Sequence, residues 1–242
     1  MTARRPALDR VTAMRLAATE NQRFLAQLRR LHAEDWTRPT DCAGWDVRDL
    51  VGHVVGMTEM SASMVEQGKQ MSAARKAGGE FIDALTAVQV TKHAKDRPEE
   101  LVERFAVIGP KSVKGRRRTP GFVLRRTLPI PQTVGDQTES WTIGFLVDIV
   151  LSRDPWMHRV DVARATGQEL ELTAEHDGVI VNDVVTEWAT RHGQPCTVEL
   201  DGPAGGRWDF AGGGSTVAGD AVDFCRGLSG RGEPALATAV PF

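Results

Sequence analysis

The segment 143–166 constrains the fold of this 242-residue chain more than any other stretch. Read at helical period, it places one stripe of side chains along a single face, and that stripe begins apolar, as a helix packed on a core requires. Beyond Val150 the stripe turns polar at Asp154, His158 and Asp161. Burying a polar group without a partner costs roughly 2–7 kcal/mol. The segment therefore predicts a core-facing helix whose second half carries a polar site.

Asp154 and His158 are the first two polar members of this stripe. They are four residues apart, so their side chains share one face of the helix. A metal ion would satisfy both, because carboxylate and neutral imidazole are common zinc ligands. The alternative is a capping aspartate followed by a histidine that is hydrogen-bonded into the core. A second inward-facing histidine elsewhere in the chain favours the metal.

That second histidine is His53, in a helical segment that begins at Asp46. Asp46 is placed to cap the helix, and Asp49 supplies an acidic residue in the first turn. His53 comes three residues after Leu50 and four before Met57, so it borders the apolar face. Two predicted helices thus each carry an imidazole at the edge of the core.

Four helical segments precede Gly167 and predict a mainly α fold. Their expected ranges are 8–33, 46–66 with an extension toward 74, 81–105 with a restart at Pro98, and 143–166. Residues 111–118 are expected in a solvated loop, and residues 119–137 are expected to be irregular. The Asp154–Pro155 pair requires either a kink or a new helix that Asp154 caps.

The chain changes character after Gly167. A helix is expected over 173–191, a strand–turn–strand over 196–210, a flexible joint at 212–214, a helix around 222–228 and a strand within 236–242. We therefore expect a four-helix bundle over residues 1–167, followed by a small α+β domain over residues 168–242.

The composition is that of an ordinary globular protein, with 41% hydrophobic and 26% charged residues. The formal net charge of −2 gives no drive toward nucleic acid or anionic membranes. No apolar run approaches the roughly 20 residues that span a bilayer, and no signal-peptide core follows the N-terminus. Three scattered cysteines, Cys42, Cys196 and Cys225, fit a reducing compartment. We expect a cytoplasmic protein without a nucleic-acid or membrane partner.

Two local features remain open. The basic residues within 111–118 could bind nucleic acid or attract an anionic substrate, but no aromatic residue is interleaved with them, so a solvated loop is favoured. Cys42 could serve as a fourth metal ligand or a reactive thiol, but nothing that flanks it in the sequence would favour the thiolate. We expect neither feature to carry the main chemistry.

Two motifs, at residues 39–53 and 154–167, resemble the signatures of the mycothiol-dependent maleylpyruvate isomerase family. That family belongs to the DinB-like four-helix-bundle metalloenzymes and has a C-terminal domain similar to sterol-carrier proteins. The resemblance implies three metal ligands, His53, Asp154 and His158, with aspartate where the family has glutamate. It also implies a catalytic arginine near the C-terminus, for which Arg226 is our candidate and Arg231 its neighbour.

The implied activity is that of a metal-dependent enzyme. Three protein ligands leave a coordination position open, as a catalytic zinc requires, although nickel and iron accept the same donors. The resemblance implies mycothiol as a thiol cosubstrate, a small electrophilic substrate, and a monomer or homodimer. The alternative is a non-catalytic carrier of an apolar ligand with a structural metal site.

Asp161 has three open roles: metal ligand, hydrogen-bond partner of a ligand imidazole, or ion-pair partner of Arg164. We expect the hydrogen bond, because His158 already occupies the stripe one turn earlier.

Overall fold

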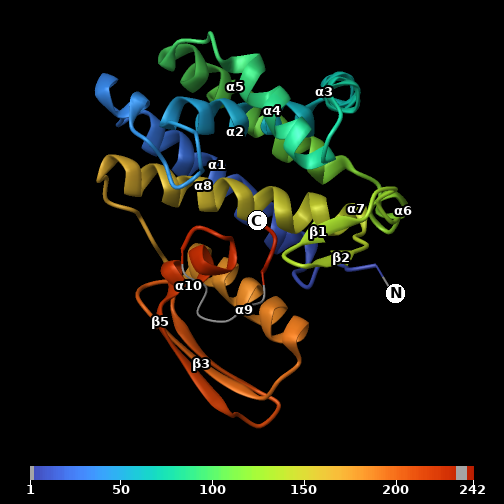
Figure 1. The fold of residues 1–242 in the computed structure, drawn as a ribbon, viewed down its shortest axis with the longest axis vertical. Helices are drawn as coiled ribbons and strands as arrows, with labels where there is room; N and C mark the ends of the chain where they lie inside the picture. The colour runs from blue at the N-terminus through green and yellow to red at the C-terminus, as the bar shows by residue number, and fades with distance from the viewer. Residues whose placement is uncertain (1–2, 233–238) are drawn as a thin grey trace. The chain divides into compact units, whose positions relative to one another are not determined.

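The computed structural model describes residues 3–232 and 239–242 (Figure 1). Its fold is mainly helical with a small sheet toward the C-terminus, as the sequence predicts. Two helices, α1 (Arg10–Leu28) and α8 (Leu151–Thr166), contribute to both of its compact units. One unit comprises Ala17–Pro120 and His158–Leu170, and the other comprises Met1–Leu16, Gly121–Met157 and Glu171–Phe242. The division into domains at residue 167 stays a prediction.

The first unit is a helical bundle around a hydrophobic core. Four helices supply most of the buried side chains: α1, α2 (Val47–Ala62), α5 (Pro98–Arg118) and α8. Helices α3 (Met64–Ala77) and α4 (Phe81–His93) pack beside α2. The core residues are Phe24, Leu28, Trp36, Val47, Leu50, Val51, Val54, Val55, Leu101, Phe105 and Val162.

Helix α2 begins where the sequence predicts and ends earlier. The Asp46 carboxylate accepts a hydrogen bond from the Asp49 amide at 2.9 Å and so caps the helix. The single helix predicted over 46–66 is wrong, because Ser63 adopts an extended conformation and ends α2. The Ser63 hydroxyl accepts a hydrogen bond from the Glu66 amide and caps α3 instead. A serine hydroxyl competes for backbone groups in this way at helix starts.

Gly56 marks the close approach of α2 to α4. A Cβ added there would lie 2.8 Å from the Cβ of Gln89 and 3.2 Å from its Cα, so backbone would have to move. Gly56→Ala is therefore expected to lower the free energy of unfolding by about 1–3 kcal/mol, the usual cost of overpacking. Urea denaturation measures the change. Gly68→Ala is the matched control, because its added Cβ meets nothing within 4 Å. The better helix propensity of alanine should raise the free energy of unfolding of this variant by about 0.5–1 kcal/mol. Equal effects of the two substitutions would contradict the packing argument.

Two segments expected to lack regular structure are ordered elements, so both expectations are wrong. Residues 111–118 form the last turns of α5, where basic side chains favour the negative end of the helix dipole, and Arg116 is buried. The segment 119–137 contains the short helix α6 (Gly121–Leu124) and strand β1 (Gln132–Val134). Strand β1 pairs antiparallel with β2 (Gln137–Glu139) through a two-residue turn.

The helical irregularity near Asp154 lies one turn earlier than expected. Helix α7 (Ile143–Phe145) leads into the π-helical segment η2 (Leu146–Val150), and α8 begins at Leu151. Asp154 lies in the first turn of α8 and caps no new helix, so that expected alternative is wrong. Pro155 has no amide hydrogen to donate to the carbonyl of Leu151, the first residue of α8. A proline is tolerated there, because it lies in the first turns of the helix.

The second unit contains a three-stranded sheet of order β4-β3-β5. Strand β3 is antiparallel to β4, as predicted, and parallel to β5, which the sequence did not indicate. Most β5 side chains are exposed, so the strand lacks the apolar alternation that identifies strands from sequence. The elements here are η3 (Ala174–Gly178), α9 (Val179–His192), β3 (Cys196–Asp201), β4 (Gly206–Phe210), β5 (Ser215–Asp220) and α10 (Ala221–Leu228).

The strand expected within 236–242 lies partly outside the described residues, and residues 239–242 form no strand. No helix in the described part of the chain is both long enough and apolar enough to cross a membrane.

Candidate metal centre

The two histidines singled out by the sequence lie side by side in the bundle. His53 projects from α2 and is 7% exposed, and His158 projects from α8 and is 3% exposed. Their ring centroids are 5.1 Å apart, and the rings meet edge to face. One ring nitrogen of each histidine lies within 4.8 Å of the other, so small shifts of the rings would let both bind one ion with bonds of about 2.0–2.1 Å. The two imidazoles lie together, as the resemblance implies, and their role as metal ligands stays a prediction.

A tryptophan from the connector before α2 covers this histidine pair. The Trp45 ring lies 5.3 Å from the His53 ring and 6.5 Å from the His158 ring. Its amide donates a hydrogen bond to the carbonyl of Cys42 at 3.0 Å, which closes a turn. Trp36, earlier in the connector, is buried in the core. Both tryptophans thus pack the connector against the bundle.

Asp161 fixes the orientation of the His158 ring. Its Oδ2 lies 3.0 Å from Nδ1 of His158, and the carboxylate is fully buried. An ionised carboxylate only accepts hydrogen bonds, so Nδ1 carries the proton and Nε2 keeps the lone pair that a metal needs. The expected hydrogen bond is confirmed. Arg164, the alternative partner of Asp161, forms an ion pair with Asp41 at 3.3 Å.

Asp154 precedes His158 by four residues on α8; the residue is half-buried, and Oδ2 of its carboxylate is buried. One ligand atom from each of His53, Asp154 and His158 lies within 4.8 Å of the other two. Two imidazoles and a carboxylate are donors that zinc, nickel and iron(II) all accept. These residues would hold a divalent ion and leave at least one coordination position for another ligand.

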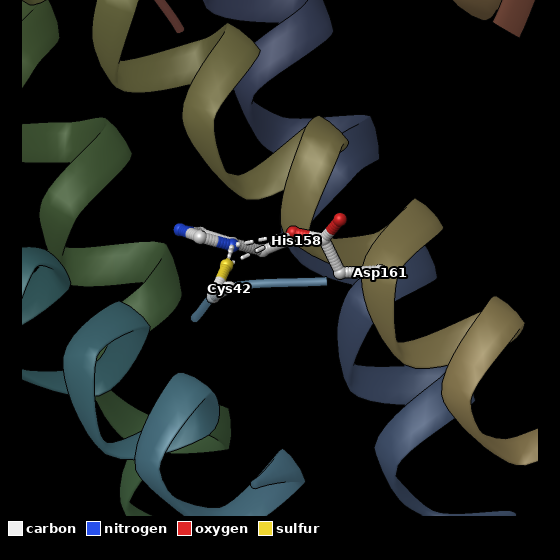
Figure 2. A group of neighbouring side chains, drawn as sticks. All are labelled: Cys42, His158 and Asp161. Carbon is white, nitrogen blue, oxygen red and sulfur yellow. Dashed lines mark hydrogen bonds and ion pairs between the residues drawn. The ribbon is translucent and has the colours of Figure 1, made fainter. Parts of the chain in front are cut away.

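Cys42, which the sequence offers as a fourth metal ligand or a reactive thiol but which we expected to stay outside the main chemistry, is a neighbour of this centre. Figure 2 shows its sulfur next to His158 and Asp161. Sγ of Cys42 lies 3.9 Å from Nδ1 of His158 and 3.5 Å from Oδ2 of Asp161. The available signal was the position of Cys42 in a turn immediately before the cap of the His53 helix. Because the contact joins residues 116 apart in the chain, no local pattern contains it.

Arg226 lies in α10 of the other unit and is 8% exposed. Its guanidinium donates hydrogen bonds to the carboxylate of Asp223 at 3.1 Å and to the carbonyl of Arg231 at 2.9 Å. These contacts order the end of α10. A catalytic role for Arg226 stays a proposal.

The basic cluster borders a cavity of about 400 Å³ between α1 and α5. Lys114 and Arg117 lie at this cavity, and most of its other lining residues are apolar: Ala18, Leu25, Phe105, Ala106, Pro110 and Val113. Two cations beside an apolar surface suit an amphipathic anion better than a nucleic-acid backbone.

The other four histidines have no second ligand at metal spacing in the sequence, which predicts them at the surface or at helix edges. His32 is exposed and His192 is half-buried, but His93 and His176 are buried, so the expectation is wrong for these two. Nδ1 of His93 lies 2.8 Å from Asp96, and its Nε2 lies 3.3 Å from Glu59. Burial opposes the ionisation of Glu59, but hydrogen bonds from His93 and Lys92 outweigh it and lower the pKa of Glu59 to about 2.

The family model of the mycothiol maleylpyruvate isomerase N-terminal domain matches residues 17–163. The chain belongs to this family. The resemblance inferred from the two motifs is thereby confirmed, and the matched span contains the whole candidate metal centre. The family is named for an enzyme. An uncharacterized protein of Mycobacterium tuberculosis, found in two strains, is 27% identical over 213 residues, which cover 81% of this chain and 76% of that protein.

Solved structures of a family enzyme share the fold. The crystal structure of the mycothiol-dependent maleylpyruvate isomerase matches with a TM-score of 0.58 at 18% identity. A histidine-to-alanine mutant of that enzyme matches with a TM-score of 0.59 at 17% identity. Each match covers 93% of this chain and 90% of the solved chain. At such identity the likeness shows the fold alone, and it confirms the predicted mainly α class.

Proposed function

We propose that this family member is a metal-dependent enzyme that uses a low-molecular-weight thiol of the mycothiol type on a small electrophilic substrate. The observation that carries the proposal is the buried pair of His53 and His158. Asp161 accepts a hydrogen bond from Nδ1 of His158, which leaves the lone pair on Nε2 free to bind a metal. Family membership supplies the thiol and the reaction class, which is isomerisation or transfer.

Some residues of this centre would bind the ion, and others would shield it from water. His53, Asp154 and His158 would supply three ligands, and Asp161 keeps His158 in the tautomer that can bind. A bound zinc ion would deprotonate a coordinating thiol, so that a thiolate is available at neutral pH without a separate base. The Trp45 ring, packed against both imidazoles, excludes water from one side of the pair. Arg226 is our candidate for binding a carboxylate of the thiol or of the substrate.

Calorimetry of mycothiol against metal-loaded protein tests this function. Wild-type protein is expected to bind mycothiol only when loaded with metal, and binding should release a proton, seen as a dependence of the heat on buffer ionisation. His158→Ala should weaken thiol binding by at least about 10-fold, because removing a metal ligand should lower metal affinity at least as much as the roughly 10–100-fold loss caused by removing a residue that supports a ligand. Arg226→Lys should weaken it less and leave the metal content unchanged.

The carrier alternative predicts different results in the same experiment. If metal-loaded protein binds no thiol, but holds an apolar ligand equally well with and without metal, the enzyme proposal fails. The cavity between α1 and α5 would then be the first place to look for the ligand.

A further inference from the structure

Cys42, His158 and Asp161 form a second group of metal donors beside the first. One ligand atom from each lies within 4.8 Å of the others. Figure 2 shows the three side chains converging, with Cys42 coming from the connector and the other two from α8. The group shares His158 with the proposed catalytic centre but meets that ring at Nδ1, whereas the catalytic ion would use Nε2.

The separations in this group fit a tetrahedral ion. Bonds of about 2.3 Å to sulfur and about 2.0–2.2 Å to nitrogen and oxygen place neighbouring ligands roughly 3.4–3.6 Å apart. The three distances are 3.9 Å from Sγ to Nδ1, 3.5 Å from Sγ to Oδ2, and 3.0 Å from Nδ1 to Oδ2. Shifts of about 0.5 Å would bring all three donors onto one ion.

The cysteine is held in place by its own turn. The Cys42 amide donates a hydrogen bond to the hydroxyl of Thr40 at 3.2 Å, and the Cys42 carbonyl accepts one from the Trp45 amide at 3.0 Å. Burial raises the thiol pKa values of the other two cysteines, Cys196 and Cys225, to about 12 for Cys225. Among the described residues, Cys42 is the cysteine whose sulfur contacts both an imidazole and a carboxylate.

We propose that Cys42, His158 and Asp161 form an inhibitory site for thiophilic divalent ions such as Cd²⁺ or excess Zn²⁺. The inference rests on the proposed function, because it concerns the same histidine. Thiolate donors select soft ions over hard ones. When such an ion binds, the thiol proton of Cys42 leaves to solvent and the proton on Nδ1 of His158 moves to Nε2. A neutral imidazole has one nitrogen with a lone pair, so the catalytic position then loses a ligand. The two positions exclude each other.

Cadmium titration of the metal-free protein tests this site, with thiolate-to-cadmium charge-transfer absorption as the readout. Wild-type protein should bind one equivalent and develop the absorption band. Cys42→Ser should still bind one equivalent, now at the His53 position, but without the band. His53→Ala should keep the band. Cys196→Ser is the matched control, because Sγ of Cys196 also lies 3.9 Å from a histidine nitrogen, Nε2 of His192, and it should keep the band.

Three results would overturn the inference: no thiolate band in wild-type protein, a band that persists in Cys42→Ser, or two cadmium ions bound at once. Circular dichroism of each variant verifies that it folds, and Cys42→Ala repeats the test with a side chain that cannot bind. These outcomes are separate from those of the proposed function. Cadmium can bind as inferred in a protein that binds no mycothiol, and mycothiol can bind where no cadmium band appears.

Discussion

Purified His53→Ala protein is expected to hold less than about a tenth of the metal bound by wild-type protein, with helical circular dichroism close to wild type. Loss of a supporting residue already costs about 10–100-fold in metal affinity, and loss of a direct ligand costs at least that much. The fold should tolerate the change, because His53 lies at the edge of the hydrophobic core and the apolar side chains that α2 contributes to that core remain. Elemental analysis of untagged protein measures the metal content.

A series of substitutions distinguishes residues that bind the metal directly from a residue that only orients a ligand. His158→Ala should match His53→Ala, while Asp161→Asn should retain metal with about 10–100-fold weaker affinity, because the hydrogen bond that orients His158 is weakened but the ring remains. His32→Ala removes an exposed imidazole that contributes to neither donor group and serves as the matched control. Full metal content in His53→Ala protein would remove His53 from the ligand set.

The parts of this centre that the sequence revealed are those encoded within a single helix. The spacing of Asp154, His158 and Asp161 on α8 is a property of helical geometry, so a period of 3.6 residues locates them on one face. The cap at Asp46 likewise fixed the start of α2 and therefore the direction of His53. That the two helices meet at these histidines followed from the resemblance to a known family, because no local pattern specifies which helices pack together.

The features that the sequence missed depend on competition between local preferences or on tertiary contacts. At Ser63 a hydroxyl cap outcompeted continuation of the helix, and both outcomes are compatible with the flanking residues. At 111–118 charge suggested a loop, although Arg116 is buried within α5. The contact between Cys42 and His158 joins the connector to a helix that is distant in the sequence, and a polar connector with proline and glycine does not specify which helix it will meet.

The largest stability effect is expected at Arg153, in the other unit. Its guanidinium lies 2.7 Å from Asp183 and 3.0 Å from Glu187, and the three side chains are only 2%, 4% and 7% exposed. Burial raises the pKa of Asp183 even with this cation beside it. Among the described residues, Arg153 is the cation that pairs with Asp183, whereas Glu187 also pairs with Arg191, 2.7 Å away. Asp183 therefore depends on Arg153 for charge compensation more than Glu187 does.

Arg153→Met is accordingly expected to lower the free energy of unfolding by about 3–5 kcal/mol, the usual result of leaving a buried charge without its partner. For a chain of this length that corresponds to a fall in Tm of roughly 6–20 °C. Arg97→Met, which removes one member of an exposed ion pair with Glu100, should leave Tm unchanged within error.

A double variant decides whether the loss comes from the orphaned charge or from lost packing. Arg153→Met combined with Asp183→Asn removes the cation and its principal anion together, so much of the stability lost in the single variant should return. Glu187 keeps its partner Arg191 in this background. Thermal and urea denaturation of the four proteins of the cycle give the coupling energy. If the double variant is as unstable as the sum of the two single variants, Arg153 stabilises this unit by filling space, and the charge argument is wrong.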